Sequence, residues 1–143
     1  MNELIIVGLF LGNLTITSYR SIPQQTDSTP FHTSTGEIVR KGGAAISRDL
    51  LCVACKKLRK RCAHPEVIGK VHYGDYVLVK NHGIFKINDC MGLTKYDKKT
   101  KRRYPINMAV DIWVATYKEE KAVGVQRHNV YLINRSAYEK KEL

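Results

Sequence analysis

The chain has 143 residues, 43% of them hydrophobic, which suits a single domain that buries its own core. This length excludes the class of very small scaffolds that need disulfides or a metal ion to fold. Its 24 Lys and Arg against 13 Asp and Glu give a net charge of +11, which favours an anionic partner: nucleic acid, a cell wall or a membrane surface. The apolar run at 4–12 is too short to cross a bilayer and follows no basic segment, so we expect no membrane span and no secretory signal.

Short strand patterns follow one another along the chain, separated by turn residues. We expect a strand or packed segment at 4–12 and further strands at 14–19, 44–47, 76–79, 84–87, 108–113 and 129–133. Asn81-His82-Gly83 predicts a hairpin turn, and a short helix is expected at 116–123, capped by Gly124. Polar loops are expected at 21–36 and 91–107, and a charged tail at 136–143. Six or seven strands with one or two short helices predict a mainly β chain closed into a barrel.

An inserted cysteine-rich loop at 52–66 interrupts the β pattern. The metal-ligating residue types there and nearby are Cys52, Cys55, Cys62, His64 and Cys90. Any four of these five are typical of a structural zinc site, while a disulfide or free thiols remain open because composition does not settle the redox compartment. No second His lies at ligand spacing, so we expect no catalytic zinc and no other cofactor for catalysis.

Three aspartates each adjoin a short apolar strand pattern: Asp49, Asp89 and Asp111. A carboxylate at the end of a strand is held rigidly and is well suited to a cleft, although Asp is also a common turn residue. Their occurrence together in one small β-rich chain makes them the first candidates for chemistry.

The order of these motifs resembles the 3D domain family, named for its three aspartates, which shares a double-psi β-barrel with the MltA-type lytic transglycosylases. The resemblance covers residues 14–133 of the single expected domain, 1–143. The segments that carry it are, in chain order, 16–19, 24–30, the Thr-Ser-Thr-Gly of 33–36, 45–49, 73–75 with Gly83 and Asp89, 110–113, and 120–124 with 130–133. The stretch 90–110 is longer and more basic than in the family, and 52–66 has no counterpart there, so substrate choice is expected to differ.

The resemblance implies a double-psi β-barrel and a lytic transglycosylase that cleaves the β-1,4 bond between N-acetylmuramic acid and N-acetylglucosamine in peptidoglycan, leaving 1,6-anhydromuramyl ends. It assigns the general acid and base to the third aspartate, Asp111. Asp89 is expected to raise the pKa of Asp111 by like-charge repulsion, and Asp49 to orient it or to bind sugar hydroxyls. The candidate substrate-binding groups are Thr17, Tyr19 and Thr35.

Two other functions remain open. The runner-up is a non-enzymatic wall-binding module or virion structural protein on the same barrel, which the remodelled 90–110 segment favours. The third is a zinc-stapled nucleic-acid-binding protein, motivated by basic runs at 56–61 and 98–103, which lack the interleaved aromatics of a stacking platform. The resemblance implies action in the cell envelope or elsewhere outside the cytoplasm, reached in a phage particle or by another route that needs no signal peptide.

Overall fold

The computed structural model describes residues 7–21, 32–51 and 69–133, and within these ranges the chain forms eight strands and one short helix. In chain order they are β1 (Val7–Tyr19), β2 (Gly43–Ile46), β3 (Tyr76–Val79), β4 (Gly83–Cys90), β5 (Thr94–Asp97), β6 (Arg102–Pro105), β7 (Ala109–Trp113), α2 (Tyr117–Val123) and β8 (Gln126–Ile133). The predicted cysteine-rich loop at 52–66, most of the loop at 21–36 and the tail at 136–143 lie outside the described residues.

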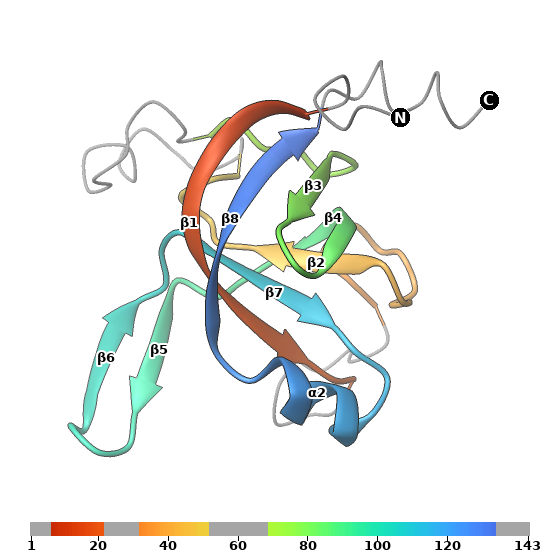
Figure 1. Ribbon diagram of the computed structural model, residues 1–143. Coiled ribbons are helices and arrows are strands. Elements are labelled where there is room, and N and C mark those ends of the chain that lie inside the picture. The colour runs from red at the N-terminus through yellow and green to blue at the C-terminus, as the bar shows by residue number, and fades with distance from the viewer. Residues whose placement is uncertain (1–6, 22–31, 52–68, 134–143) are drawn as a thin grey trace.

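Six of the strands close into a barrel in the order β1-β7-β2-β4-β3-β8, with β8 returning to β1 (Figure 1). The pairs β1 with β7 and β2 with β4 are parallel, and the remaining neighbours are antiparallel. This arrangement confirms the expectation of a mainly β chain with a closed barrel and a short helix. Parallel neighbours need long connections, so both parallel pairs join residues that are far apart in the sequence.

Aliphatic side chains from alternate strand positions fill the barrel. Ile16 of β1, Ile87 of β4 and Val110 of β7 are fully buried in this core. Because successive residues of a strand point to opposite faces, Thr17 and Asp111 turn their side chains away from the core. The hydrophobic pattern therefore decides which face of the barrel wall carries the polar residues.

The predicted hairpin turn at 81–83 and the predicted short helix both form at the residues expected from the sequence. The turn at 81–83 joins β3 to β4, and its Asn81 and Gly83 have positive φ values of 74° and 111°. Thr116 caps α2 by accepting the N–H of Glu119 at 3.1 Å, and Gly124 ends the helix at a φ of 55°.

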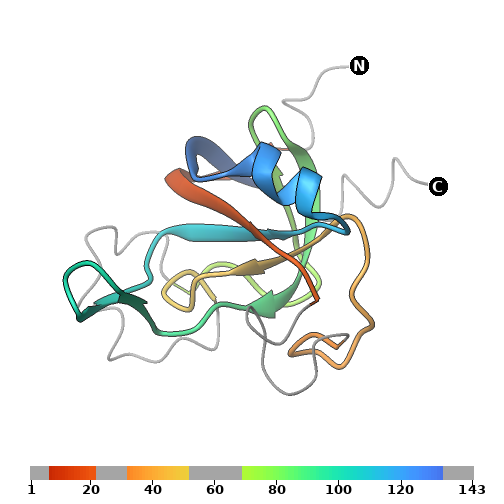
Figure 2. The same ribbon diagram turned by 90° about the horizontal axis from the view of Figure 1, so that it is seen from below.

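Residues 94–105, called the arm below, form two strands where the sequence predicts a loop. The sequence favoured a polar loop over 91–107, but β5 and β6 pair antiparallel there, from Thr94 opposite Pro105 to Asp97 opposite Arg102. Figures 1 and 2 both show the arm projecting away from the barrel. Its strands are exposed on both faces, so no alternation of apolar and polar residues marks them in the sequence.

Candidate active site

Two of the three predicted acids share one face of the barrel wall. β2 lies between β7 and β4, and its Ala45 pairs with Asp111 on one side and with Asp89 on the other. Thr17 of β1 pairs with Asp111 from the opposite side. Directly paired residues point to the same face, so these four form a row across four strands, called the acid row below. The two acids stand two strands apart, which separates their backbones by about 10 Å.

Asp111 carries the most perturbed carboxyl group of the acid row. Its pKa is raised from 3.8 to about 6, mainly by burial. The Thr17 hydrogen bond and the charge of Lys95 act to lower this pKa, and the charges of Asp89 and Glu120 act to raise it. The Thr17 hydroxyl donates to Asp111 Oδ1 at 2.9 Å. Burial, rather than the expected repulsion from Asp89, is thus the main cause of the raised pKa. The group can hold or release a proton near neutral pH.

Asp89 is held by donors from two segments. Its Oδ1 accepts the backbone N–H of Ser34 at 3.0 Å, the Ser34 hydroxyl, and the N–H of Cys90 at 2.9 Å. The turn that carries Ser34 is fastened to β4, because Glu37 accepts from Lys86 Nζ at 3.2 Å and from Asn88 Nδ2 at 3.4 Å. The sequence had singled out Thr35 in this motif, whereas its neighbour Ser34 reaches the acid. Thr35 instead bonds Thr33, with their hydroxyl oxygens 2.8 Å apart.

Two tyrosines with raised pKa values lie around the acids. Tyr19, only 6% exposed, has a pKa raised first by burial and then by the charges of Asp89 and Asp111, so both acids act on its hydroxyl group. The pKa of Tyr73 is raised to about 12 by burial and by its hydrogen bond with Cys90. Both phenols stay protonated at physiological pH and can donate hydrogen bonds. Tyr19 was predicted from the sequence and Tyr73 was not.

The third predicted acid, Asp49, lies outside the acid row. It is 2% exposed, and its two carboxylate oxygens accept the backbone N–H of Met108 at 3.3 and 3.1 Å. Met108 precedes β7 and has a φ of 48°, a conformation that needs fixing by its surroundings. Met108 lies three positions before Asp111, roughly 10 Å along a strand. Asp49 therefore positions the start of β7, and the structure does not bring it to Asp111.

Two charged residues near Asp111 had no signal in the sequence. Lys95 belongs to the arm, and Glu120 belongs to α2, where it lies 3.5 Å from the Arg20 guanidinium. Ser18 donates to the carbonyl oxygen of Glu120 at 3.4 Å, which holds the helix against β1. Only the folding of the arm and of α2 brings these charges close enough to act on the pKa of Asp111.

The zinc prediction concerns mostly residues that the structure does not describe. Cys52, Cys55, Cys62 and His64 lie outside the described residues, so zinc, disulfide and free thiols stay open. Cys90 is half-buried, with its sulfur 3.5 Å from the Ser34 hydroxyl. In the part of the chain that is described, no three His, Cys, Asp or Glu side chains gather as a metal ion would need.

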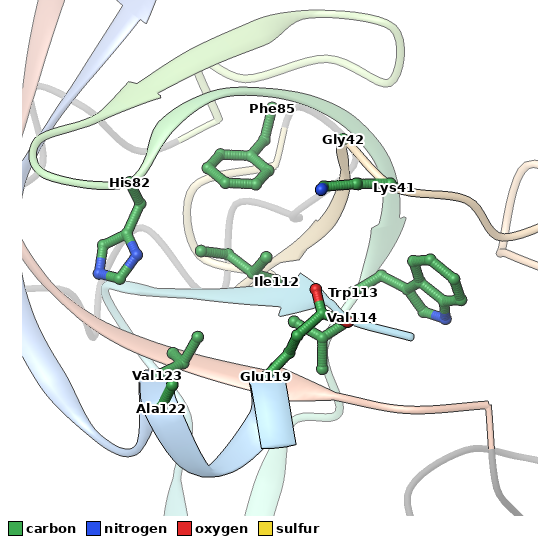
Figure 3. A pocket seen from close by; sticks show the side chains of 10 residues that line it. All are labelled: Lys41, Gly42, His82, Phe85, Ile112, Trp113, Val114, Glu119, Ala122 and Val123. Carbon is green, nitrogen blue, oxygen red and sulfur yellow. The ribbon is translucent and has the colours of Figure 1, made fainter. Parts of the chain in front are cut away.

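Figure 3 shows a cavity of about 270 Å³ whose lining contains none of the four residues of the acid row. Its apolar lining includes Phe85, Ile112 and Val123, accompanied by charged or polar side chains such as Glu119. Ile112 follows Asp111 in β7 and points to the other face of that strand. Since the carboxyl group with the raised pKa lies outside this cavity, the acid row stays the candidate site.

No protein-family model matches the chain, and no curated protein sequence matches it either. The resemblance to the three-aspartate family therefore stays a prediction, carried by the order of the motifs. Within residues 7–21, 32–51 and 69–133, no helix has both the length and the apolar content needed to cross a membrane.

Proposed function

We propose that the protein is a lytic transglycosylase that cleaves the glycan strands of peptidoglycan. The observation that carries this proposal is Asp111, a half-buried carboxyl group with a pKa of about 6 and a fixed Thr17 donor. A general acid works best when its pKa lies near the working pH, because it then holds a proton and still releases it readily. The order of motifs along the chain points to the same reaction.

One carboxyl group is sufficient for this reaction. Protonated Asp111 donates its proton to the oxygen that links N-acetylmuramic acid to the next N-acetylglucosamine, and the bond from the muramyl anomeric carbon to that oxygen breaks. The 6-hydroxyl of the same muramyl residue then bonds to the anomeric carbon, and its proton passes to Asp111. Asp111 is protonated again, no water is consumed, and the products are a free 4-hydroxyl and a 1,6-anhydromuramyl end.

The surroundings of Asp89 favour a single proton carrier in the acid row. Ala45 lies between Asp111 and Asp89 in the row. Asp89 also has one oxygen occupied by donors from Ser34 and Cys90. Its charge would support the positive anomeric centre of the transition state while Asp111 moves the proton.

The proposed substrate implies action at the cell envelope. Delivery inside a phage particle or by another export route belongs to this proposal. The net charge of +11 would favour association with a negatively charged wall.

Digestion of purified sacculi tests the proposal. We expect the wild-type protein to release muropeptides with 1,6-anhydromuramyl ends, detected by mass spectrometry, and Asp111→Asn to release them at least about 100-fold more slowly. Glu119→Gln on α2 is the matched control, since glutamine keeps the bond to Thr116 and lies off the acid row.

Two outcomes would contradict the assignment. Full activity in Asp111→Asn would remove Asp111 as the acid. Binding of the wild-type protein to sacculi without any released muropeptide would favour the runner-up function, a non-enzymatic wall-binding module.

A further inference from the structure

The arm is the most strongly charged exposed part of the described chain. Within 94–105 its one acid is Asp97, and its six basic residues are Lys95, Lys98, Lys99, Lys101, Arg102 and Arg103. Figures 1 and 2 show β5 and β6 standing clear of the barrel. A projecting ribbon with six cations and one acid favours an anionic partner.

The register of the arm places an aromatic ring beside a cation on each face of the ribbon. Lys95 pairs with Tyr104 on one face, and Tyr96 pairs with Arg103 on the other. The tyrosines are 50% and 44% exposed, so both rings are open to a ligand. Bonds within the arm orient these groups: the Tyr104 hydroxyl donates to Thr100 at 3.0 Å. Strand pairing therefore places Tyr96 and Tyr104 beside the basic residues, an arrangement of aromatics that the order of residues in the basic run does not reveal.

The arm is attached at the two strands that carry the acids. It leaves the end of β4 shortly after Asp89 and returns to the start of β7 shortly before Asp111. Its base is closed by the N–H of Ile106, which donates to the carbonyl oxygen of Leu93 at 2.9 Å. The charge of Lys95 acts on Asp111 itself. A polymer lying across the acid row would therefore also lie against the arm.

We infer that the arm binds the acidic groups of the same polymer whose glycosidic bond lies at Asp111, which on the proposed function are the carboxylates of the peptides that branch from the glycan strand. This inference rests on the proposed function. The negative charges of the acid row favour a glycan strand over nucleic acid as this polymer. Asp89 and Asp111 would repel a strand with phosphates along its whole backbone, whereas a glycan strand puts uncharged sugars at the acids and its carboxylates to the side.

Binding to sacculi stripped of secondary polymers tests the inference. The Asp111→Asn protein serves as the background, so that binding is measured without cleavage. Removing three charges at the arm's tip, with Lys98→Gln, Lys99→Gln and Arg102→Gln together, should weaken binding about tenfold and flatten its dependence on salt. The matched variant with Lys98→Arg, Lys99→Arg and Arg102→Lys keeps the charge and should bind as the background protein does. Tyr96→Ala tests the ring separately and should also weaken binding.

Three comparisons decide the outcome. Unchanged binding in the charge-removing variant would overturn the inference, and equal binding to uncharged chitin would do the same. Tighter, arm-dependent binding to a single-stranded or duplex oligonucleotide than to sacculi would replace the wall polymer with nucleic acid.

The cleavage assay separates the two proposals. In the protein that keeps Asp111, the three charge-removing substitutions should raise KM for sacculi and leave kcat unchanged. If the wild-type protein binds sacculi through the arm but releases no muropeptide, the proposed reaction fails and the binding surface stands. If it cleaves sacculi with no dependence on the arm, the arm inference fails and the reaction stands.

Discussion

Asp111 and Asp89 belong to one row but differ in what surrounds them. Among the described residues Asp111 accepts a side-chain hydrogen bond from Thr17, and its pKa is raised mainly by burial, so it can change its protonation state. Asp89 accepts from Ser34 and Cys90 and is fixed as an acceptor. Two carboxyl groups with such different surroundings suit different roles, one moving a proton and one supplying a fixed charge.

The pH dependence of cleavage should report the protonation of Asp111. Because its pKa is raised to about 6, the acid form is present below that pH and is lost as pH rises through it. Asp89→Asn removes a charge that raises this pKa, so the fall in kcat should move to lower pH. Thr17→Val removes a bond that lowers it, so the fall should move to higher pH. Shifts in the same direction, measured from pH–rate profiles, would contradict this assignment.

The same group should make the protein less stable in its ionised form. A raised carboxyl pKa contributes stability that is fully present below 3.8, the value for an unfolded chain, and is lost as pH rises through about 6. Asp111→Asn cannot ionise and should therefore be more stable than wild type at pH 8, by about 1–3 kcal/mol at 1.36 kcal/mol per pH unit. Urea unfolding should show this difference shrinking at pH 4. An Asn variant no more stable at pH 8 would contradict it.

Residue types alone could not separate the three aspartates. All three follow or lie in apolar strand patterns, and the sequence grouped them. The barrel register brings Asp89 and Asp111 together through Ala45, while Asp49 accepts the N–H of Met108. Register and backbone partners are set by tertiary pairing, which a single sequence does not display.

At the level of elements, the start of β7 depends on Asp49. Asp49→Ala would leave the N–H of Met108 without this buried acceptor, which should cost about 1–3 kcal/mol of unfolding free energy. Asp49→Asn keeps an acceptor oxygen and should cost less. Thermal or denaturant unfolding measures both, and the pH profile of residual cleavage should stay unchanged. A shifted pH profile in Asp49→Asn would instead favour the expected tuning of Asp111.

The strands of the barrel could be predicted from the sequence because each has a buried face. Alternation at 14–19 and apolar runs at 44–47, 76–79 and 108–113 mark β1, β2, β3 and β7. β5 and β6 bury neither face, so they pair through backbone bonds and the turn around Lys101, whose φ is 57°. Hydrophobic periodicity cannot reveal such strands, so the sequence predicts a loop over 91–107.

At the scale of the whole molecule, the closed barrel and the mainly β class followed from the number and spacing of short strands. The strand order did not follow, since β7 lies between β1 and β2 and no local pattern indicates which distant strands pair. The site could be anticipated as a set of acids and their flanking polar residues. Its electrostatic surroundings, from Ser34, Lys95 and Glu120, required the assembled molecule.

The parallel pairing of β1 with β7 has a consequence for the life of the chain before it folds. The Thr17–Asp111 bond joins residues 94 positions apart, so it forms only when distant parts of the chain meet, at the entropy cost of closing a long loop. Until β7 inserts between β1 and β2, Asp111 is an ordinary solvated carboxyl group with no reason to keep a proton at neutral pH. A newly made chain would thus be inactive, and the proposed activity would appear only when the barrel closes.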